Sequence, residues 1–285
     1  MTPKQALSPD DFTALAAETK VGLLATVTPE GLPHVTLITS LRGLDAGHLM
    51  FGQFSEGMSK GNVRENGNCG FFVLTLDRRT WRGRAVWTHE KKEGPEYELF
   101  NSMPMFRYNA YFGIHTVHYL DLLEVTGPAP LPLARSAASL AVAGLFSPFS
   151  ARRRAEPVMK PWARSFMNAL TTLKFVAHVG EDGFPRIIPC IGCRAADPGR
   201  LVFSPLAAPG EFAAIPAGAT VAVFGMGMQA ESVLMRGPLY WFSRAGVRLG
   251  VVDVDWVYNT MPPVPGQVYP EKPLSPVTDF GFPAS

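Results

Sequence analysis

Short apolar runs separated by tight glycine turns dominate the chain and predict β-strands. Near the start, the runs "KVGLLATVT" and "LPHVTLITSLRG" flank an "EG" turn, a pattern typical of a β-hairpin. A third run, "HLMF", follows the turn "GLDAG". Further runs at "CGFFVLTL", "TWRGRAVWTHE" and "HYLDLLEV" complete six strands. We expect them to form a small antiparallel barrel, because closure removes exposed strand edges.

The same pattern occurs twice along the chain. When residues 27–51 are laid over residues 179–203, a constant offset of 152 positions aligns eight identical residues without a gap. The identical pairs are Val27 and Val179, Gly31 and Gly183, Pro33 and Pro185, Arg42 and Arg194, Asp45 and Asp197, Gly47 and Gly199, Leu49 and Leu201, and Phe51 and Phe203. The runs "ATVAVFGMG", "SVLMRGPLYWFS" and "GVVDVDWVY" supply further strands of the second copy. The sequence therefore predicts a mainly β chain with two tandem six-stranded antiparallel barrels and flanking helices.

Helices are expected around and between the barrels. Ser8 and the acidic residues after it form an N-cap signal in "SPDDFTALAAETK". A short helix is predicted in "EGPEYELFNSM" and a longer one at "LARSAASLAVAGLF", with "SPFSARRRAEP" as an exposed loop. These patterns divide the chain into a first barrel at 1–126, a helical connector and basic loop at 127–165, a second barrel at 166–262 and a Pro-rich extended tail at 263–285.

Composition and charge narrow the classes of function. Apolar residues make up 47% of the chain and charged residues 18%, which is typical of a packed globular protein. The net charge of +2 argues against a nucleic-acid binder. The N-terminus lacks a signal-peptide pattern, and no apolar run approaches the roughly 18 residues that span a bilayer. We therefore expect a cytoplasmic protein that binds neither nucleic acid nor membrane.

One connection between strands carries a candidate anion site. Ser59 and Lys60 stand at the start of a predicted helix, where an ammonium, a hydroxyl and free helix N–H groups can hold a phosphate monoester. A solvated loop whose serine caps the helix is the alternative for the same residues. At the 152-residue offset Glu211 and Phe212 take their places, and neither favours phosphate. We therefore expect a phosphate site in the first copy and a degenerate one in the second.

The order of these features resembles the FMN-binding split barrels related to pyridoxamine 5'-phosphate oxidase. The features that carry the resemblance are Gly31 with Pro33, the strand "HVTLIT", Phe51, the pair Ser59 and Lys60, and the segment "VRENGN". The resemblance covers residues 10–125 and, more weakly, 165–260. It implies two tandem split β-barrels, a non-covalently bound FMN, and a flavin-dependent oxidoreductase acting on a small-molecule substrate or electron donor.

The resemblance also implies particular site residues. The expected cofactor-binding residues are Thr36, Leu37, Ile38, Thr39, Ser59, Lys60, Arg64, Trp81 and Arg82. Arg64 would reach the phosphate or else form a surface pair, and Trp81 and Arg82 would lie beside the flavin or serve only as strand residues. A weaker expectation places a substrate near the aromatic stretch at Arg107, Tyr108 and Tyr111, which could equally pack beneath the barrel.

The degenerate second copy predicts how the site is assembled. Single-barrel relatives of this kind pair as homodimers, with each flavin contacted by both subunits. A tandem chain could form that pair internally, so that one FMN is held by the first copy against the second. Further dimerisation between chains stays open, and a deazaflavin would place its phosphate and ring in similar positions.

Two other motifs suggest different chemistry. His115 and His118 in "HTVH" would provide an axial ligand if the protein were a haem-binding or haem-degrading barrel. A pair of barrels that senses a ligand or serves a structural role without a cofactor is a further alternative. Cys190 and Cys193 in "CIGC" fall on a predicted strand, where residues three apart point to opposite faces. We therefore expect buried free thiols there and no metal site.

Overall fold

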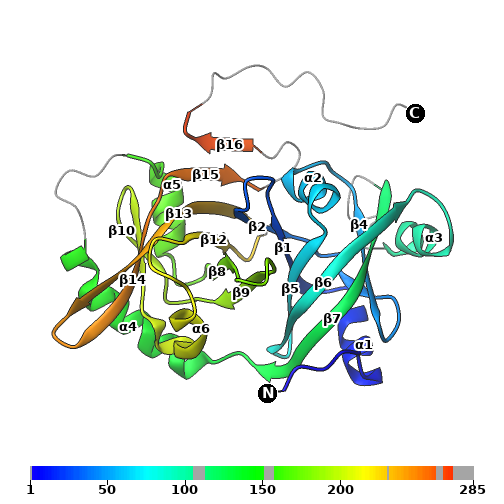
Figure 1. Cartoon of the computed structure of the whole chain (residues 1–285), viewed down its shortest axis with the longest axis horizontal. Coiled ribbons are helices and arrows are strands. Elements are labelled where there is room, and N and C mark those ends of the chain that lie inside the picture. The colour runs from blue at the N-terminus through cyan, green and yellow to red at the C-terminus, as the bar shows by residue number, and fades with distance from the viewer. Residues whose placement is uncertain (1, 105–112, 151–156, 230, 261–265, 272–285) are drawn as a thin grey trace.

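The computed structural model describes residues 2–104, 113–150, 157–229, 231–260 and 266–271, and places two β-sheets beside each other (Figure 1). The first half contains α1 (Pro9–Ala16), β1 (Lys20–Val27), β2 (Pro33–Leu37), β3 (Arg42–Gly43), β4 (His48–Gln53), α2 (Met58–Glu65), β5 (Asn68–Thr75), β6 (Arg79–Lys91), α3 (Pro95–Ser102) and β7 (Thr116–Pro130). The connector contains α4 (Leu133–Ser150) and α5 (Pro161–Asn168). The second half contains β8 (Leu173–Val179), β9 (Pro185–Pro189), β10 (Arg194–Asp197), β11 (Arg200–Phe203), η2 (Pro205–Ala207), α6 (Pro209–Ala213), β12 (Thr220–Met226), β13 (Ser232–Arg244), β14 (Val247–Asp253), β15 (Trp256–Asn259) and β16 (Gly266–Tyr269).

Both sheets are antiparallel and follow the same chain path. Among the described strands, the first sheet has the order β2-β1-β5-β6-β7-β4-β3, and the second has the corresponding order β9-β8-β12-β13-β14-β11-β10. In the second sheet β15 also pairs with the first half of β13, and β16 pairs with β15. The long β7 of the first half is therefore replaced by two strands, β14 and β15. The predicted mainly β fold with two tandem antiparallel units is confirmed.

The sheets differ from the expected barrels in strand number and closure. They contain seven and nine described strands, where six were expected in each, and neither sheet is closed. The predicted strand "LPHVTLITSLRG" is one cause, because it divides into β2 and β3. A turn closed by a 3.1 Å hydrogen bond from the Leu41 N–H to the Ile38 carbonyl separates them. β2 and β3 therefore lie at the two ends of the first sheet and do not pair with each other.

The two halves differ in the connection between β6 and β7 and its counterpart between β13 and β14. In the first half, residues 92–115 join β6 to β7 and contain α3. In the second half, Ala245 and Gly246 alone join β13 to β14, both with positive φ, as a tight hairpin turn requires. The first half thus carries an additional segment beside its sheet.

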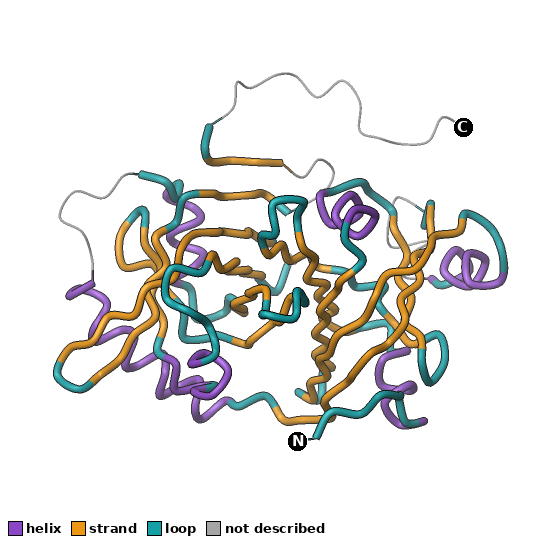
Figure 2. The backbone as a smooth tube through the Cα atoms, in the orientation of Figure 1, coloured by secondary structure: helices purple, strands orange, loops and turns teal. Residues whose placement is uncertain are grey.

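The helices surround the sheets (Figure 2). The predicted cap of α1 is present, because the Ser8 Oγ accepts a hydrogen bond from the Asp11 N–H (3.2 Å). α4 continues through Pro148 to Ser150, so part of the predicted exposed loop is helical. β7 runs to Pro130, beyond the predicted domain boundary at 126. None of the described helices is both long and apolar enough to cross a bilayer.

The two sheets pack on each other through a shared apolar cluster. From the first half it contains Leu23, Ala25, Val35 and Phe72, and from the second half their counterparts at the 152-residue offset, Phe175, Ala177, Ile187 and Phe224, together with Ala222, Met226, Leu234 and Tyr258. Phe72 and Phe175 meet at 5.0 Å between ring centroids. Gly70 allows the close approach, since a Cβ there would lie 2.1 Å from the Pro185 carbonyl oxygen. The two halves therefore form an internal pair within one chain.

Candidate functional site

A cavity of about 200 Å³ opens where the two halves meet, and we call it the inter-half pocket. Its walls come from the end of β2 and the following turn, from the connection between β4 and α2, and from the second half near β13 and β15. The first half contributes His34, residues 36–40 and residues 52–60, and the second half contributes Ser232, Tyr258 and Thr260. Neither half alone provides the complete pocket.

Two side chains in the first turn of α2 line the pocket without polar partners among the described residues. Ser59 is 2% exposed, and its Oγ makes no hydrogen bond with any of them. Lys60 is 6% exposed, and its ammonium forms no ion pair with a carboxylate of the described residues. Burial lowers the pKa of Lys60 to about 8, opposed by electrostatic attraction from Glu56. Since an unpaired buried cation destabilises a folded protein, this arrangement favours an anionic ligand.

The start of α2 adds a third feature that suits an anion. Gly57 precedes the helix, and no side chain caps it. Uncapped N–H groups carry partial positive charge and attract anions. On the opposite wall, Tyr258 belongs to the shared apolar cluster on which Met58 packs, so the second half contacts this helix directly. The Lys60 ammonium, the Ser59 hydroxyl and the start of α2 together suit a phosphate monoester.

His34 lies in the same pocket and was not predicted as a site residue. It is 1% exposed, and its Nδ1 has no hydrogen-bond partner in the part of the chain that the structure describes. Burial, together with the positive charges of Arg236 and Lys60, lowers the pKa of His34 to about 3. The Tyr258 ring stands edge-on to it, with centroids 5.4 Å apart. His34 is therefore a neutral imidazole with an unused hydrogen-bonding atom.

Most of the predicted cofactor residues lie together. Thr36, Leu37, Ile38, Thr39, Ser59 and Lys60 all line the inter-half pocket. Thr36 and Leu37 end β2, whereas Ile38 and Thr39 belong to the turn after it. Their expected role at a flavin remains a prediction, but a single cavity contains all six.

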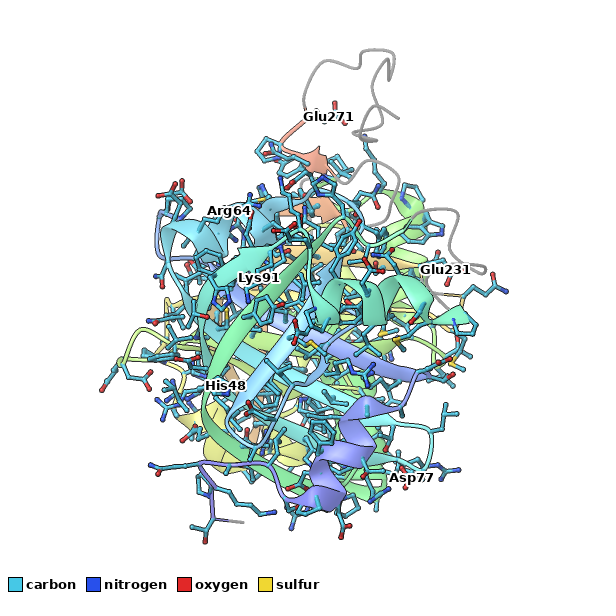
Figure 3. The ribbon with its side chains drawn as sticks, turned by 90° about the vertical axis from the view of Figure 1, so that its right-hand side faces the viewer. His48, Arg64, Asp77, Lys91, Glu231 and Glu271 are labelled. Carbon is cyan, nitrogen blue, oxygen red and sulfur yellow. The ribbon has the colours of Figure 1, made fainter. Side chains whose placement is uncertain are left out.

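The other predicted residues lie elsewhere. The Arg64 guanidinium pairs with the Glu90 carboxylate (Nη2 to Oε2, 2.9 Å) on the outer side of the molecule, where Figure 3 labels it. Trp81 is in the core of the first sheet, and its Nε1–H donates to the Asp11 Oδ1 (2.8 Å). Arg107, Tyr108 and Tyr111 fall outside the described residues. Arg82 lies in a different pocket.

That pocket is the counterpart of the inter-half pocket. It has a volume of about 230 Å³, and Thr80, Pro189, Ala208 and Glu211 on its walls correspond to Ser232, Leu37, Glu56 and Ser59 at the 152-residue offset. Here Arg82 and Glu211 form a bidentate ion pair across the two halves, with one Nη2 to Oε1 distance of 2.9 Å. Its charged groups are therefore paired with each other.

Neither predicted histidine is arranged as a buried metal ligand. His118 is buried, its Nε2 is bonded to the Gln53 Oε1 (2.6 Å), and its Nδ1 accepts from the Trp87 Nε1–H (3.1 Å). His115 is exposed, and its Nδ1 lies 2.8 Å from the Thr116 Oγ1. Within the described residues, no group of three or more His, Cys, Asp or Glu side chains could hold a metal ion.

The cysteine pair lies on a turn, which corrects the predicted strand placement. The Cys193 N–H donates to the Cys190 carbonyl (2.9 Å) immediately after β9. Both thiols are buried and free, and burial raises the pKa of Cys190 well above its usual value. The argument from opposite strand faces therefore does not hold, although both residues are buried free thiols.

No family model matches the sequence, and no curated protein matches it. Among solved structures, HupZ from Group A Streptococcus is similar, with 16% identity over 42% of this chain and 91% of that chain, and a TM-score of 0.35. An FMN-binding protein from Syntrophomonas wolfei has 17% identity over 40% and 81%, with a TM-score of 0.36. A candidate pyridoxamine 5'-phosphate oxidase from Lactobacillus delbrueckii has 17% identity over 45% and 100%, with a TM-score of 0.34. FMN-binding and pyridoxamine 5'-phosphate oxidase-like proteins, the kind that the sequence resembles, are thus among the solved structures that match less than half of this chain.

Proposed function

We propose that this protein binds FMN, or a closely related phosphorylated flavin, in the inter-half pocket. The observation that carries the proposal is the buried, unpaired Lys60 beside the unpartnered Ser59 hydroxyl at the uncapped start of α2. A phosphate monoester carries close to two negative charges at neutral pH and would offset the unfavourable burial of the ammonium. Ser59, Lys60 and the helix start would hold this group.

The remaining walls fit the rest of such a ligand. Thr36 and Thr39 line the pocket, and their hydroxyl groups suit a polyol chain, while Leu37 and Ile38 provide apolar side chains. The cavity of about 200 Å³ accommodates the phosphate and part of the chain that bears it, and its mouth opens to solvent. The donor set and the shape are therefore compatible with the phosphate end of FMN.

The proposed activity is that of a flavin-dependent oxidoreductase with a small-molecule substrate or electron donor. A bound flavin supplies hydride or electron transfer, whereas the protein binds and orients it. In this chain the first half would bind the phosphate, and Tyr258 of the second half would close the opposite wall. No described residue is assigned a catalytic role. The haem alternative is weakened because both ring nitrogens of His118 are already hydrogen-bonded.

Titration with FMN, riboflavin and a phosphorylated deazaflavin, followed by flavin fluorescence, tests the proposal. We expect FMN to bind more tightly than riboflavin, which lacks the phosphate. Lys60→Met should weaken FMN binding by about 1.5–3 kcal/mol, roughly 10- to 150-fold, because a charge-assisted contact is lost. Arg64→Met is the matched control and should change affinity less than about twofold, because Arg64 pairs with Glu90 outside the pocket. Equal affinity for FMN and riboflavin, or no binding of either, would refute the phosphate site.

A further inference from the structure

A hydrogen-bonded chain connects the core of the first sheet to the inter-half pocket. Trp87 Nε1–H donates to His118 Nδ1 (3.1 Å), and His118 Nε2 meets the Gln53 Oε1 (2.6 Å). Gln53 Nε2–H then donates to the Glu56 Oε1 (2.8 Å). Gln53 and Glu56 both line the pocket, and Gln53 is buried. The chain therefore ends in a carboxylate at the wall that also carries Lys60.

The direction of every hydrogen bond in this chain is determined. An ionised carboxylate only accepts, so the Gln53 amide must turn its NH₂ toward Glu56 and its oxygen toward His118. His118 must then carry its proton on Nε2, which leaves Nδ1 free to accept from Trp87. Burial lowers the pKa of His118 to about 3, so the ring is neutral, as this arrangement requires. Every member of this hydrogen-bonded chain therefore has a partner, and its last bond orients the Glu56 carboxylate toward the Gln53 amide.

Glu56 is a natural competitor for any anion that binds Lys60. It precedes Lys60 by four positions, and its charge attracts the Lys60 ammonium. Yet no carboxylate of the described residues lies within the 4.0 Å that defines an ion pair with Lys60. The Glu56 Oε1 is instead bonded to Gln53. An acidic side chain close to a buried cation is thus held by a different partner.

The second half lacks every part of this arrangement. At the 152-residue offset, Pro205 replaces Gln53, Ala208 replaces Glu56 and Phe212 replaces Lys60. Where the cation is absent, the carboxylate and the amide that holds it are absent too. This joint presence in one half and joint absence in the other links Gln53 and Glu56 to Lys60.

We propose that Gln53 is a positioning residue that holds the Glu56 carboxylate away from Lys60 and so reserves the ammonium for the anionic group of a ligand. The inference rests on the proposed phosphate site. Without the Gln53 amide, Glu56 is free to pair with Lys60, and a phosphate then has to displace it.

A double-mutant cycle with FMN tests this role. Gln53→Met should weaken FMN binding by about tenfold or more, whereas Glu56→Gln alone should stay within about threefold of the unmodified protein. The double variant should bind within about threefold of Glu56→Gln, because no carboxylate is left to compete. A general packing defect would not be rescued in this way. If the double variant binds as weakly as Gln53→Met, or if Gln53→Met binds normally, the proposal is wrong.

Titration of the Lys60 ammonium by NMR tests the same role without a ligand. In Gln53→Met the pKa of Lys60 should rise above its value of about 8, because Glu56 then pairs with it. The rise should disappear in the double variant, and an unchanged pKa would contradict the proposal. Should Gln53→Met fail to fold, Gln53→Asn keeps a buried amide that is too short to span His118 and Glu56, and the same results are expected. Absence of FMN binding would refute the proposed function while leaving this measurement decisive for Gln53.

Discussion

The pocket at Lys60 and its counterpart at Glu211 occupy corresponding places in the two halves, yet their polar groups are arranged in opposite ways. In the first, Ser59 and Lys60 are buried, and neither the Ser59 hydroxyl nor the Lys60 ammonium has a polar partner among the described residues. In the second, Glu211 is paired with Arg82, and Phe212 packs on Phe203 with ring centroids 4.7 Å apart. One backbone arrangement thus supports a site whose polar groups lack partners and a site whose groups satisfy one another. This difference is the reason for proposing the ligand site in the first half.

Placing a lysine, as at position 60 of the first half, at the corresponding position 212 of the second half tests this contrast most strongly. Phe212→Lys should destabilise the protein by about 4 kcal/mol or more, because Phe212 is wholly buried in the core of the second half and a lysine there would be unpaired. Leu206→Lys is the matched control, since Leu206 is 47% exposed in the neighbouring η2, and it should cost less than about 0.5 kcal/mol. Urea unfolding measures both. If Phe212→Lys left the free energy of unfolding unchanged, position 212 would not require a buried apolar side chain.

The pH dependence of the free energy of unfolding tests whether burial of Lys60 in the first half destabilises the protein. The pKa of Lys60 is about 8 in the folded protein against an ordinary value of 10.5. The folded state therefore releases this proton at lower pH than the unfolded state, and stability should rise between about pH 8 and 10.5, by up to about 3 kcal/mol. Lys60→Met should be more stable than the unmodified protein at pH 7, and the difference should shrink across this window. Parallel pH profiles of the two proteins, measured by urea unfolding, would show that burial of Lys60 carries no such cost.

Removal of the ion pair in the counterpart pocket should have the smallest effect. Arg82 and Glu211 side chains are 37% and 41% exposed, and pairs of this kind contribute at most about 1 kcal/mol. Arg82→Met should therefore change the free energy of unfolding by less than that amount. It should leave FMN affinity within about twofold, since Arg82 does not line the inter-half pocket. A large loss of FMN affinity would instead indicate that the flavin binds in the counterpart pocket at Arg82, and would contradict the proposed site.

Local patterns in the sequence were sufficient to predict the mainly β fold, the two tandem units and the helix cap at Ser8. The predicted helix start indicated Ser59 and Lys60 as an anion site, and the resemblance to the split barrels implied residues 36–39, and all six line one pocket. The break after Leu37 was missed, since an apolar run does not reveal a turn whose side chains are buried.

The predicted site residues that lie outside the inter-half pocket are held there by packing at longer range. Trp81 has the aromatic character of a cofactor contact, but Asp11 of a distant helix accepts its hydrogen bond in the core. Arg82 points across the interface, so its pocket depends on how the halves pair. His34 and Tyr258 meet for the same reason, and neither carries a local signal. These contacts follow from the arrangement of two sheets, which the order of residues along one strand does not specify.

The connector that contains α4 and α5 has a consequence for how the pocket persists in solution. Because it joins the halves covalently, their association is intramolecular, and a linker confers an effective concentration on the order of millimolar. Dilution does not separate the wall at Tyr258 from the wall at Lys60. A complex of two separate barrels would lose its composite pocket below the dissociation constant of its interface, whereas this chain keeps its inter-half pocket at any concentration.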